Sequence, residues 1–148
     1  MWHLKKNIFI DRRTEEVHQF TTDPQYWYQW YAGLSEGKNM VGTGKKGTSM
    51  DLDFTMLGKE WPIHILVEEN ANRGDGYIWR GSISGAITAE QTWLYIPKGE
   101  GVDITFEMDY ELPGVLLARV ANRLYIKKLM ENSLEQTLRN LKDISESD

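Results

Sequence analysis

The sequence has 148 residues, of which 41% are hydrophobic and 26% are charged; its formal net charge at pH 7 is −5, and it contains no cysteine. The lack of cysteine excludes thiolate metal sites and thiol nucleophiles, and an acidic chain without a long basic face is a poor partner for nucleic acid. A mean hydropathy of −0.52, no apolar run of membrane-spanning length and no signal-peptide pattern predict a cytoplasmic protein without stable membrane insertion.

The N-terminal part predicts three elements: a strand over residues 2–10, a helix over 12–20 and a short second helix over 25–31. Thr14 is a suitable N-cap for the first helix, because two glutamates follow it and complement the helix dipole. Pro24 suits the first position of the second helix. In that helix Trp27 and Trp30 stand three residues apart, so both face the same way.

The middle of the chain predicts consecutive strands with a two-residue hydrophobic period, over residues 50–56, 61–67, 77–83, 87–96 and 104–110. Short stretches rich in glycine, asparagine and proline separate them, including residues 70–76, and such spacing indicates hairpins and an antiparallel meander of about six strands. The polar members of the alternating segments, Asp51, Asp53, Glu107 and Asp109, are expected on the face that water covers.

The C-terminal part predicts one long helix over residues 113–142. Its apolar stripe is expected to contain Leu116, Leu117, Val120, Leu124, Leu134, Leu138 and Leu141. Lys127 and Glu131 interrupt this stripe at its centre. In one interpretation the helix rotates locally, so that Ile126, Leu129 and Met130 make the contact and the charges reach solvent. In the other, the central turn overlooks a cavity, where the Lys127–Glu131 pair meets the polar end of a ligand.

These elements together predict an α+β helix-grip fold in a single domain over residues 1–148, with residues 145–148 as a loose acidic tail. The sheet has an apolar concave face, which the C-terminal helix covers. The sequence is also rich in tryptophan and tyrosine, which fill cores in any fold but also line pockets.

Several motif-like strings do not have the context that their chemistry needs. The string Gly42-Thr43-Gly44-Lys45-Lys46-Gly47 has the spacing of a dinucleotide loop, but no helix follows to hold a pyrophosphate, so a turn is predicted. The string Gly81-Ser82-Ile83-Ser84-Gly85 has isoleucine where a nucleophile elbow needs serine. The three histidines show no metal-ligand spacing, and we expect neither a metal nor a cofactor.

Candidate acid–base groups are scattered rather than clustered. Glu90, Glu131 and Asp109 could exchange protons, and Arg80 could anchor an oxyanion or a carboxylate. His64 alternates with two isoleucines in a predicted strand, so it faces either solvent or a pocket. None of these groups forms a recognisable catalytic constellation.

Segments along almost the whole chain resemble the START-like SRPBCC superfamily: Thr22-Asp23-Pro24 with Trp27 and Trp30, the hairpin 97–101 leading into 102–105, residues 110–114, Ser133-Leu134, and residues 140–142. The nearest groups are the polyketide cyclase/dehydrase and coenzyme Q-binding ones. The resemblance implies a seven-stranded antiparallel sheet gripping the C-terminal helix, with an elongated hydrophobic cavity between them. Members bind lipids, quinones, polyketides or plant hormones, and some are cyclases or dehydratases. No catalytic residues of a cyclase match positions in this sequence.

We therefore expect the protein to bind or carry a lipophilic small molecule, such as an isoprenoid quinone, a lipid or an aromatic polyketide. The side chains expected to contact it are Trp27, Trp30, Phe54, Tyr77, Trp79, Trp93, Tyr95, Phe106, Tyr110, Leu117, Val120, Leu124, Lys127 and Glu131. One alternative is an aromatase/cyclase-type enzyme in which Glu131, His64 or a pocket tyrosine moves protons. A second is an interaction module whose cavity is filled by its own aromatic rings.

Overall fold

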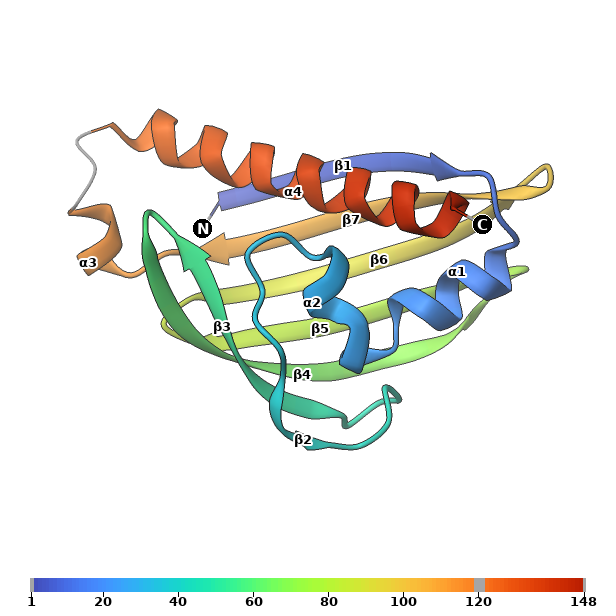
Figure 1. The fold of residues 1–148 in the computed structure, drawn as a ribbon, viewed down its shortest axis with the longest axis horizontal. Coiled ribbons are helices and arrows are strands. Elements are labelled where there is room, and N and C mark those ends of the chain that lie inside the picture. Colours follow the sequence, from blue (N-terminus) through green and yellow to red (C-terminus); the bar gives the residue numbers. More distant parts are fainter. Residues whose placement is uncertain (1, 119–121, 148) are drawn as a thin grey trace.

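The computed structural model describes residues 2–118 and 122–147, which form one antiparallel sheet with helices packed on one side of it (Figure 1). In chain order the elements are β1 (Trp2–Ile10), α1 (Thr14–Thr21), the 3₁₀ helix η1 (Pro24–Tyr26), α2 (Trp27–Trp30), β2 (Lys38–Val41), β3 (Ser49–Met56), β4 (Lys59–Arg73), β5 (Gly76–Gly85), β6 (Thr88–Lys98), β7 (Gly101–Glu111), α3 (Gly114–Leu117) and α4 (Arg123–Glu146).

The sheet has seven strands in the order β1-β7-β6-β5-β4-β3-β2, which confirms the predicted helix-grip topology. Strands β2 to β7 follow one another as a meander, and β1 pairs with β7. β4 continues to Arg73, so the turn predicted over residues 70–76 is confined to Gly74 and Asp75. All four residues of β2 are exposed, and β2 therefore lacks the alternation that reveals the other strands.

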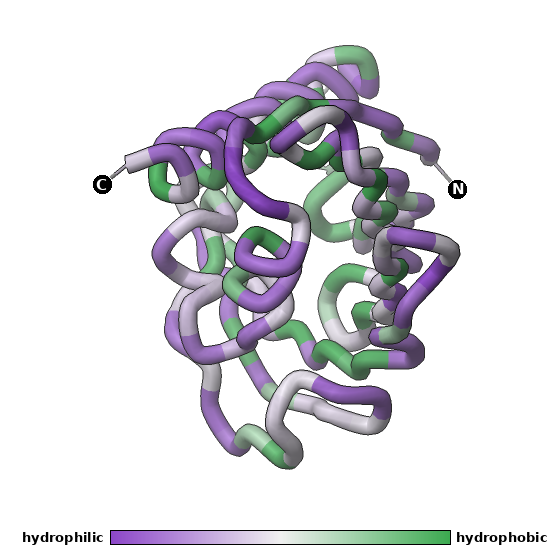
Figure 2. The backbone as a smooth tube through the Cα atoms, turned by 90° about the vertical axis from the view of Figure 1, so that its right-hand side faces the viewer, coloured by the Kyte–Doolittle hydropathy of each residue, from purple (hydrophilic) through white to green (hydrophobic). Residues whose placement is uncertain are grey.

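One face of the sheet carries the core. In β3 the side chains of Met50 and Leu52 are buried, while Asp51 and Asp53 are half-buried on the opposite face, as predicted. Hydrophobic and hydrophilic residues alternate along the chain in the end-on view of Figure 2. A register shift between Val67 and Glu69 interrupts the β4–β5 ladder, and such bulges bend a strand. The apolar face thus curves toward the helices.

The C-terminal segment forms two helices, so the prediction of one helix over residues 113–142 is wrong. Asn122 is extended, with φ −123° and ψ 111°, and its side chain accepts a hydrogen bond of 2.9 Å from the backbone N–H of Leu124. Asparagine is among the strongest N-caps, and it starts α4 as a new helix. The 24 residues of α4 span about 36 Å, and the helix lies along the sheet in Figure 1.

The buried face of α4 begins with Ile126 and Met130 and continues through Leu134, Leu138 and Leu141. Leu124 is 73% exposed, so the predicted stripe is wrong at its N-terminal end. Lys127 is exposed as well, which agrees with the interpretation in which the helix rotates locally. Among the described residues, no helix has the length and apolar character needed to cross a bilayer.

The two N-terminal helices differ in detail from the prediction. Thr14 is the first residue of α1 rather than its N-cap, and its hydroxyl donates instead to the carbonyl oxygen of Gly101 at 3.4 Å. Asp23 caps the second helical segment by accepting a hydrogen bond of 3.3 Å from the N–H of Gln25. Pro24 begins this segment as expected, but its first turn is 3₁₀ and its α-helical part starts at Trp27.

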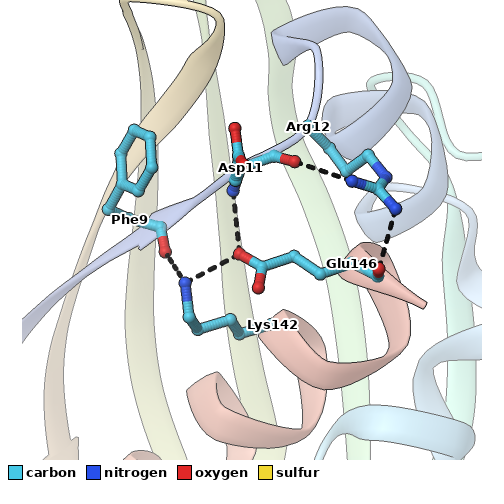
Figure 3. Close-up of polar contacts among 5 residues, drawn as sticks. All are labelled: Phe9, Asp11, Arg12, Lys142 and Glu146. Carbon is cyan, nitrogen blue, oxygen red and sulfur yellow. Dashed lines mark hydrogen bonds and ion pairs between the residues drawn. The ribbon is translucent and has the colours of Figure 1, made fainter.

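Polar contacts connect the C-terminal end of α4 to the end of β1 and to the residues that follow it (Figure 3). Lys142 Nζ donates to the carbonyl oxygen of Phe9 and to Glu146 Oε2, both at 2.7 Å. Glu146 Oε2 also accepts from the backbone N–H of Asp11 at 2.8 Å, and Arg12 donates to the Glu146 carbonyl oxygen at 2.7 Å. Glu146 is therefore part of an ordered junction, not of the loose tail predicted over residues 145–148.

We expect replacement of Glu146 by glutamine to weaken this junction in a pH-dependent way. The hydrogen bond from Asp11 and then Lys142 lower the pKa of Glu146 below its ordinary 4.5. The stabilisation is therefore present above pH 4.5 and disappears as the pH falls through the lowered value. At pH 7 the variant should be less stable by about 1 kcal/mol, because the group is near the surface. Urea unfolding at pH 7 and pH 3 checks this; an equal difference at both pH values would contradict it.

Thr137 connects α4 to the segment after α2. It is fully buried, its Oγ1 accepts from the N–H of Ala32 at 3.0 Å, and its hydroxyl donates to the carbonyl oxygen of Ser133 at 2.9 Å. Asn140 makes a second link by donating to the carbonyl oxygen of Trp30 at 3.2 Å. These bonds hold α2 against α4 and so fix the position of Trp30.

The substitution Thr137→Val keeps the side-chain shape but leaves the Ala32 N–H without an acceptor. We expect it to destabilise the fold by about 1 to 3 kcal/mol, the usual cost of a buried unpaired donor. Amide hydrogen exchange at Ala32 should speed up in this variant. Thr137→Ser is the matched control: it loses a methyl group but keeps the acceptor, so exchange at Ala32 should stay slow relative to the valine variant.

Candidate functional site

Two small apolar cavities lie between the sheet and the helices within the described part of the chain. The first, which we call the tryptophan cavity, measures about 20 Å³ and is lined by Thr21, Trp27, Trp30, Tyr31, Leu34, Ile65, Trp79, Gln91, Trp93 and Tyr95. The second, the aliphatic cavity, measures about 30 Å³ and is lined by Tyr31, Leu34, Phe54, Ile63, Ile83, Ile87, Ala89, Met108, Tyr110 and Met130. Tyr31 and Leu34 line both cavities.

The register of the central strands gathers the aromatic rings at the tryptophan cavity. Trp79 of β5 lies opposite Trp93 of β6, and Trp93 lies opposite Phe106 of β7. Two tryptophans of the second helical segment complete the cluster: Trp27 packs edge-to-face on Trp79 and Trp30 on Trp93, with centroid distances of 5.7 and 5.6 Å. This predicted pair of tryptophans therefore covers the middle of the sheet.

A short chain of hydrogen bonds orders one side of the tryptophan cavity. Trp27 Nε1 donates to the carbonyl oxygen of Thr21 at 2.8 Å, and the Thr21 hydroxyl lies 2.6 Å from the Tyr95 hydroxyl. Trp93 Nε1 donates to Gln91 Oε1 at 3.3 Å, and Gln91 in turn hydrogen-bonds to Tyr31. These contacts fix the rings at the wall of the cavity.

Other buried polar atoms at the cavities have no hydrogen-bond partner among the described residues. They are Trp30 Nε1 and Trp79 Nε1 at the tryptophan cavity and the hydroxyl of Tyr110 at the aliphatic cavity. Buried polar groups in proteins are nearly always paired, so each exception asks for an explanation.

The buried tyrosines are neutral at physiological pH. Burial raises the pKa of Tyr31 and of Tyr95 well above the ordinary value of 10. Burial, together with the charge of Glu131, raises the pKa of Tyr110 to about 12. These hydroxyls can therefore donate or accept hydrogen bonds, but they do not supply a base at pH 7.

The structure brings together seven of the residues proposed as ligand contacts; those that line a cavity are Trp27, Trp30, Phe54, Trp79, Trp93, Tyr95 and Tyr110. Two others lie close by without lining a cavity. Tyr77 stacks on His18 with a centroid distance of 3.9 Å, and Phe106 is buried behind Trp93. His18 Nε2 also lies 2.8 Å from Asn70 Oδ1, so this histidine fixes α1 to β4.

Most residues of the C-terminal segment that were expected to contact a ligand do not line either cavity. Leu124 and Lys127 lie on the solvent side of α4, because Ile126 and Met130 occupy its inner face. Leu117 and Glu131 are half-buried and line neither cavity, although Glu131 influences the pKa of Tyr110. Val120 lies outside the described residues.

Most of the candidate acid–base groups lie on the outer face of the sheet. His64 Nδ1 contacts Asp51 Oδ1 at 2.8 Å, Arg80 Nε donates to Glu69 at 2.8 Å, and Asp109 contacts His3 at 2.7 Å. His64 thus faces solvent, and Arg80 is not an anchor for a ligand in the interior. In the described ranges, no group of three or more histidine, aspartate or glutamate side chains is arranged to hold a metal ion.

Sequence reasoning missed Tyr31 and Gln91, which are central to the site. Gln91 alternates in phase with Trp93 and Tyr95 in β6, so the two-residue period was sufficient to place it on the inner face. Tyr31 follows the last residue of α2, where the chain becomes extended, and no periodicity indicates its direction. Only the packed structure shows that it lines both cavities.

A family model described as "Polyketide cyclase / dehydrase and lipid transport" matches residues 1–146. The chain belongs to this family. No curated protein sequence matches it significantly.

Solved structures similar to this family member share its fold. A START superfamily protein from Mycobacterium smegmatis has a TM-score of 0.75 and 16% identity, over 97% of both chains. A STAR-related lipid transfer protein from Xanthomonas axonopodis has a TM-score of 0.74 and 16% identity, over 98% of this chain and 86% of its own. A protein from Thermus thermophilus has a TM-score of 0.74 and 21% identity, over 96% of this chain and 95% of its own. At these identities the likeness establishes the START-like fold alone.

Proposed function

We propose that the protein binds and carries a lipophilic small molecule, such as an isoprenoid quinone, a lipid or an aromatic polyketide, between the sheet and α4. The observation that carries the proposal is the pair of apolar, aromatic-lined cavities in a protein of the polyketide cyclase/dehydrase and lipid transport family. The name of the Xanthomonas axonopodis relative, a lipid transfer protein, supports the same class of ligand.

The described residues enclose two small cavities rather than the elongated one that the resemblance implied, and we call this conformation the closed form. Cavities of about 20 and 30 Å³ hold one or two water molecules each, whereas ligand sites usually measure about 300–1,000 Å³. Binding therefore requires the interior to expand. Displacement of Tyr31 and Leu34 would join the two cavities, because both residues line both of them. Because only the open molecules can bind, the apparent affinity is the intrinsic affinity multiplied by the fraction of molecules that are open.

A thermal-shift screen with quinones, lipids and aromatic ketones tests the proposal. A ligand at a hundred times its Kd stabilises the native state by about 2.7 kcal/mol, which raises the Tm of a domain of this size by about 5 to 10 °C. Native mass spectrometry of gently purified protein should also reveal bound lipophiles. Protein without adducts and without any shift would support instead an interaction module with a filled interior.

The enzyme alternative has weaker support. The described residues that line the two cavities provide hydroxyl, indole and amide groups, but no carboxylate, imidazole or amine. A cyclase or dehydratase reaction needs a group that accepts a proton, and the buried tyrosines are held in their neutral form. Hydrogen bonding to a bound ligand is therefore the chemistry that the site supports.

A further inference from the structure

Unpaired hydrogen-bond donors are concentrated at the two cavities. The buried side-chain atoms without a partner in the described residues are Trp30 Nε1, Trp79 Nε1, Tyr110 Oη, Glu68 Oε1 and Ser145 Oγ. The first three belong to residues that line the cavities, although the atoms themselves are covered in this conformation, and the other two belong to residues that do not. Two of these three are indole N–H groups, which donate and never accept.

The two indoles differ from their neighbours in the same cavity. Trp27 and Trp93 also line it, yet both have acceptors, at Thr21 and Gln91. The described residues therefore supply an acceptor for some indoles at this wall, and they leave Trp30 and Trp79 without one. Edge-to-face packing against other rings does not replace a hydrogen bond, since contacts of an N–H with a ring are weak.

We propose that Trp30 and Trp79 form a recognition site for a neutral carbonyl oxygen at the edge of a flat ring compound. This inference rests on the proposed function and specifies the ligand class: an aromatic ketone or quinone rather than a hydrocarbon or a fatty acid. When the interior opens, the carbonyl oxygen accepts from the indole N–H groups that are unpaired in the closed form. The unpaired hydroxyl of Tyr110 offers a further donor at the aliphatic cavity.

The lining also argues against charged ligands. The described residues around the two cavities contain no lysine, arginine or histidine, so a carboxylate would lose its hydration without gaining a counter-charge. A ligand hydroxyl brings a hydrogen that needs an acceptor; Gln91 Oε1 already accepts from Trp93, whereas the Tyr110 hydroxyl can accept at the aliphatic cavity. A carbonyl group matches the unpaired donors without adding a donor of its own.

The test compares 1-indanone with indane, two bicyclic compounds that differ by one carbonyl group. Equilibrium dialysis gives the ratio of their affinities for the wild-type protein and for Trp79→Phe, Trp30→Phe and Trp27→Phe. Phenylalanine removes the indole N–H and keeps an aromatic ring. Because a change in cavity shape affects both compounds, the ratio isolates the hydrogen bond. Trp27→Phe is the matched control, since the Trp27 N–H already has an acceptor.

We expect the indanone-to-indane ratio to fall by about tenfold in Trp79→Phe or Trp30→Phe, the equivalent of about 1.4 kcal/mol, and to stay unchanged in Trp27→Phe. If both compounds bind and the ratio of their affinities is the same in all four proteins, this inference is overturned. The proposed function would still stand. A water held by the two indoles would give that result. Failure of both compounds to bind at any concentration counts against the proposed function itself.

Indole proton signals in nuclear magnetic resonance provide a second readout that does not depend on a folded variant. In wild-type protein the Nε1–H signals of Trp30 and Trp79 should lie further downfield with 1-indanone bound than with indane bound. The signal of Trp27, whose N–H keeps its acceptor at Thr21, should move by the same amount with both compounds. The same difference between the two compounds for all three signals would contradict a specific role for Trp30 and Trp79.

Discussion

Replacement of Tyr31 by alanine is expected to join the tryptophan cavity and the aliphatic cavity, because its side chain lines both. Loss of the ring from a partly buried position should lower the free energy of unfolding by about 3 kcal/mol. In return the variant should bind benzene, as apolar cavities of about 150 Å³ do. Urea unfolding and the Tm with and without benzene measure the two effects.

Two control variants separate cavity formation from general loosening. Tyr31→Phe keeps the ring between the cavities, so it should not bind benzene, and it loses only the hydrogen bond with Gln91. Phe20→Ala removes a half-buried ring that lines neither cavity. If benzene raises the Tm of Tyr31→Ala no more than that of these controls, then the interior collapses around the missing ring. Tyr31 would then not be the residue that separates the two cavities.

The substitution Gly76→Ala is expected to cause a large loss of stability from a single methyl group. A Cβ atom at Gly76 would overlap the carbonyl oxygen of Tyr95, and Pro97 also lies close, at 3.1 Å. Tyr95 belongs to β6, which is paired on both sides, and its side chain is buried, so its backbone cannot move without disturbing two ladders. We expect a cost of about 3 kcal/mol, the upper end for overpacking, measured by urea unfolding.

Gly74, in the same hairpin, is the matched control for Gly76. Its φ is +62°, and a Cβ atom there would meet nothing within 4 Å. Asparagine tolerates this conformation better than other side chains, so Gly74→Asn should cost less than about 1 kcal/mol. Equal losses at both positions would show that the hairpin conformation, rather than the contact with Tyr95, sets the cost at Gly76.

Periodicity was sufficient to predict strands β3 to β7, because strands with one buried face alternate visibly in sequence, whereas the exposed strand β2 has no such pattern. It was less informative at the C-terminus, where leucines at helical spacing suggested one uninterrupted helix. The break comes from Asn122, whose side chain caps α4, and a single capping residue without proline or glycine is a weak signal. Once α4 starts at Arg123, Ile126 takes the inner position that Leu124 was expected to hold.

The candidate site could be predicted only in part. The aromatic residues of β5 and β6 share an inner face by simple alternation, and Trp27 and Trp30 share one by helical spacing. How tightly these rings fill the interior depends on their rotamers and on the path of the chain after α2. Neither can be read from the composition. For the same reason no sequence pattern distinguishes Trp27, with its acceptor at Thr21, from Trp79, which has none among the described residues.

The pairing of β1 with β7 also determines when the protein can finish folding. Trp2 lies opposite Tyr110 and Ile10 opposite Val102, so the partner of β1 is translated about a hundred residues later. At ribosomal rates of roughly 5–20 residues per second, β1 remains an open strand edge for about 5 to 20 s. Contacts of such long sequence separation also slow folding in isolation. The nascent chain is therefore most exposed to aggregation before β7 emerges.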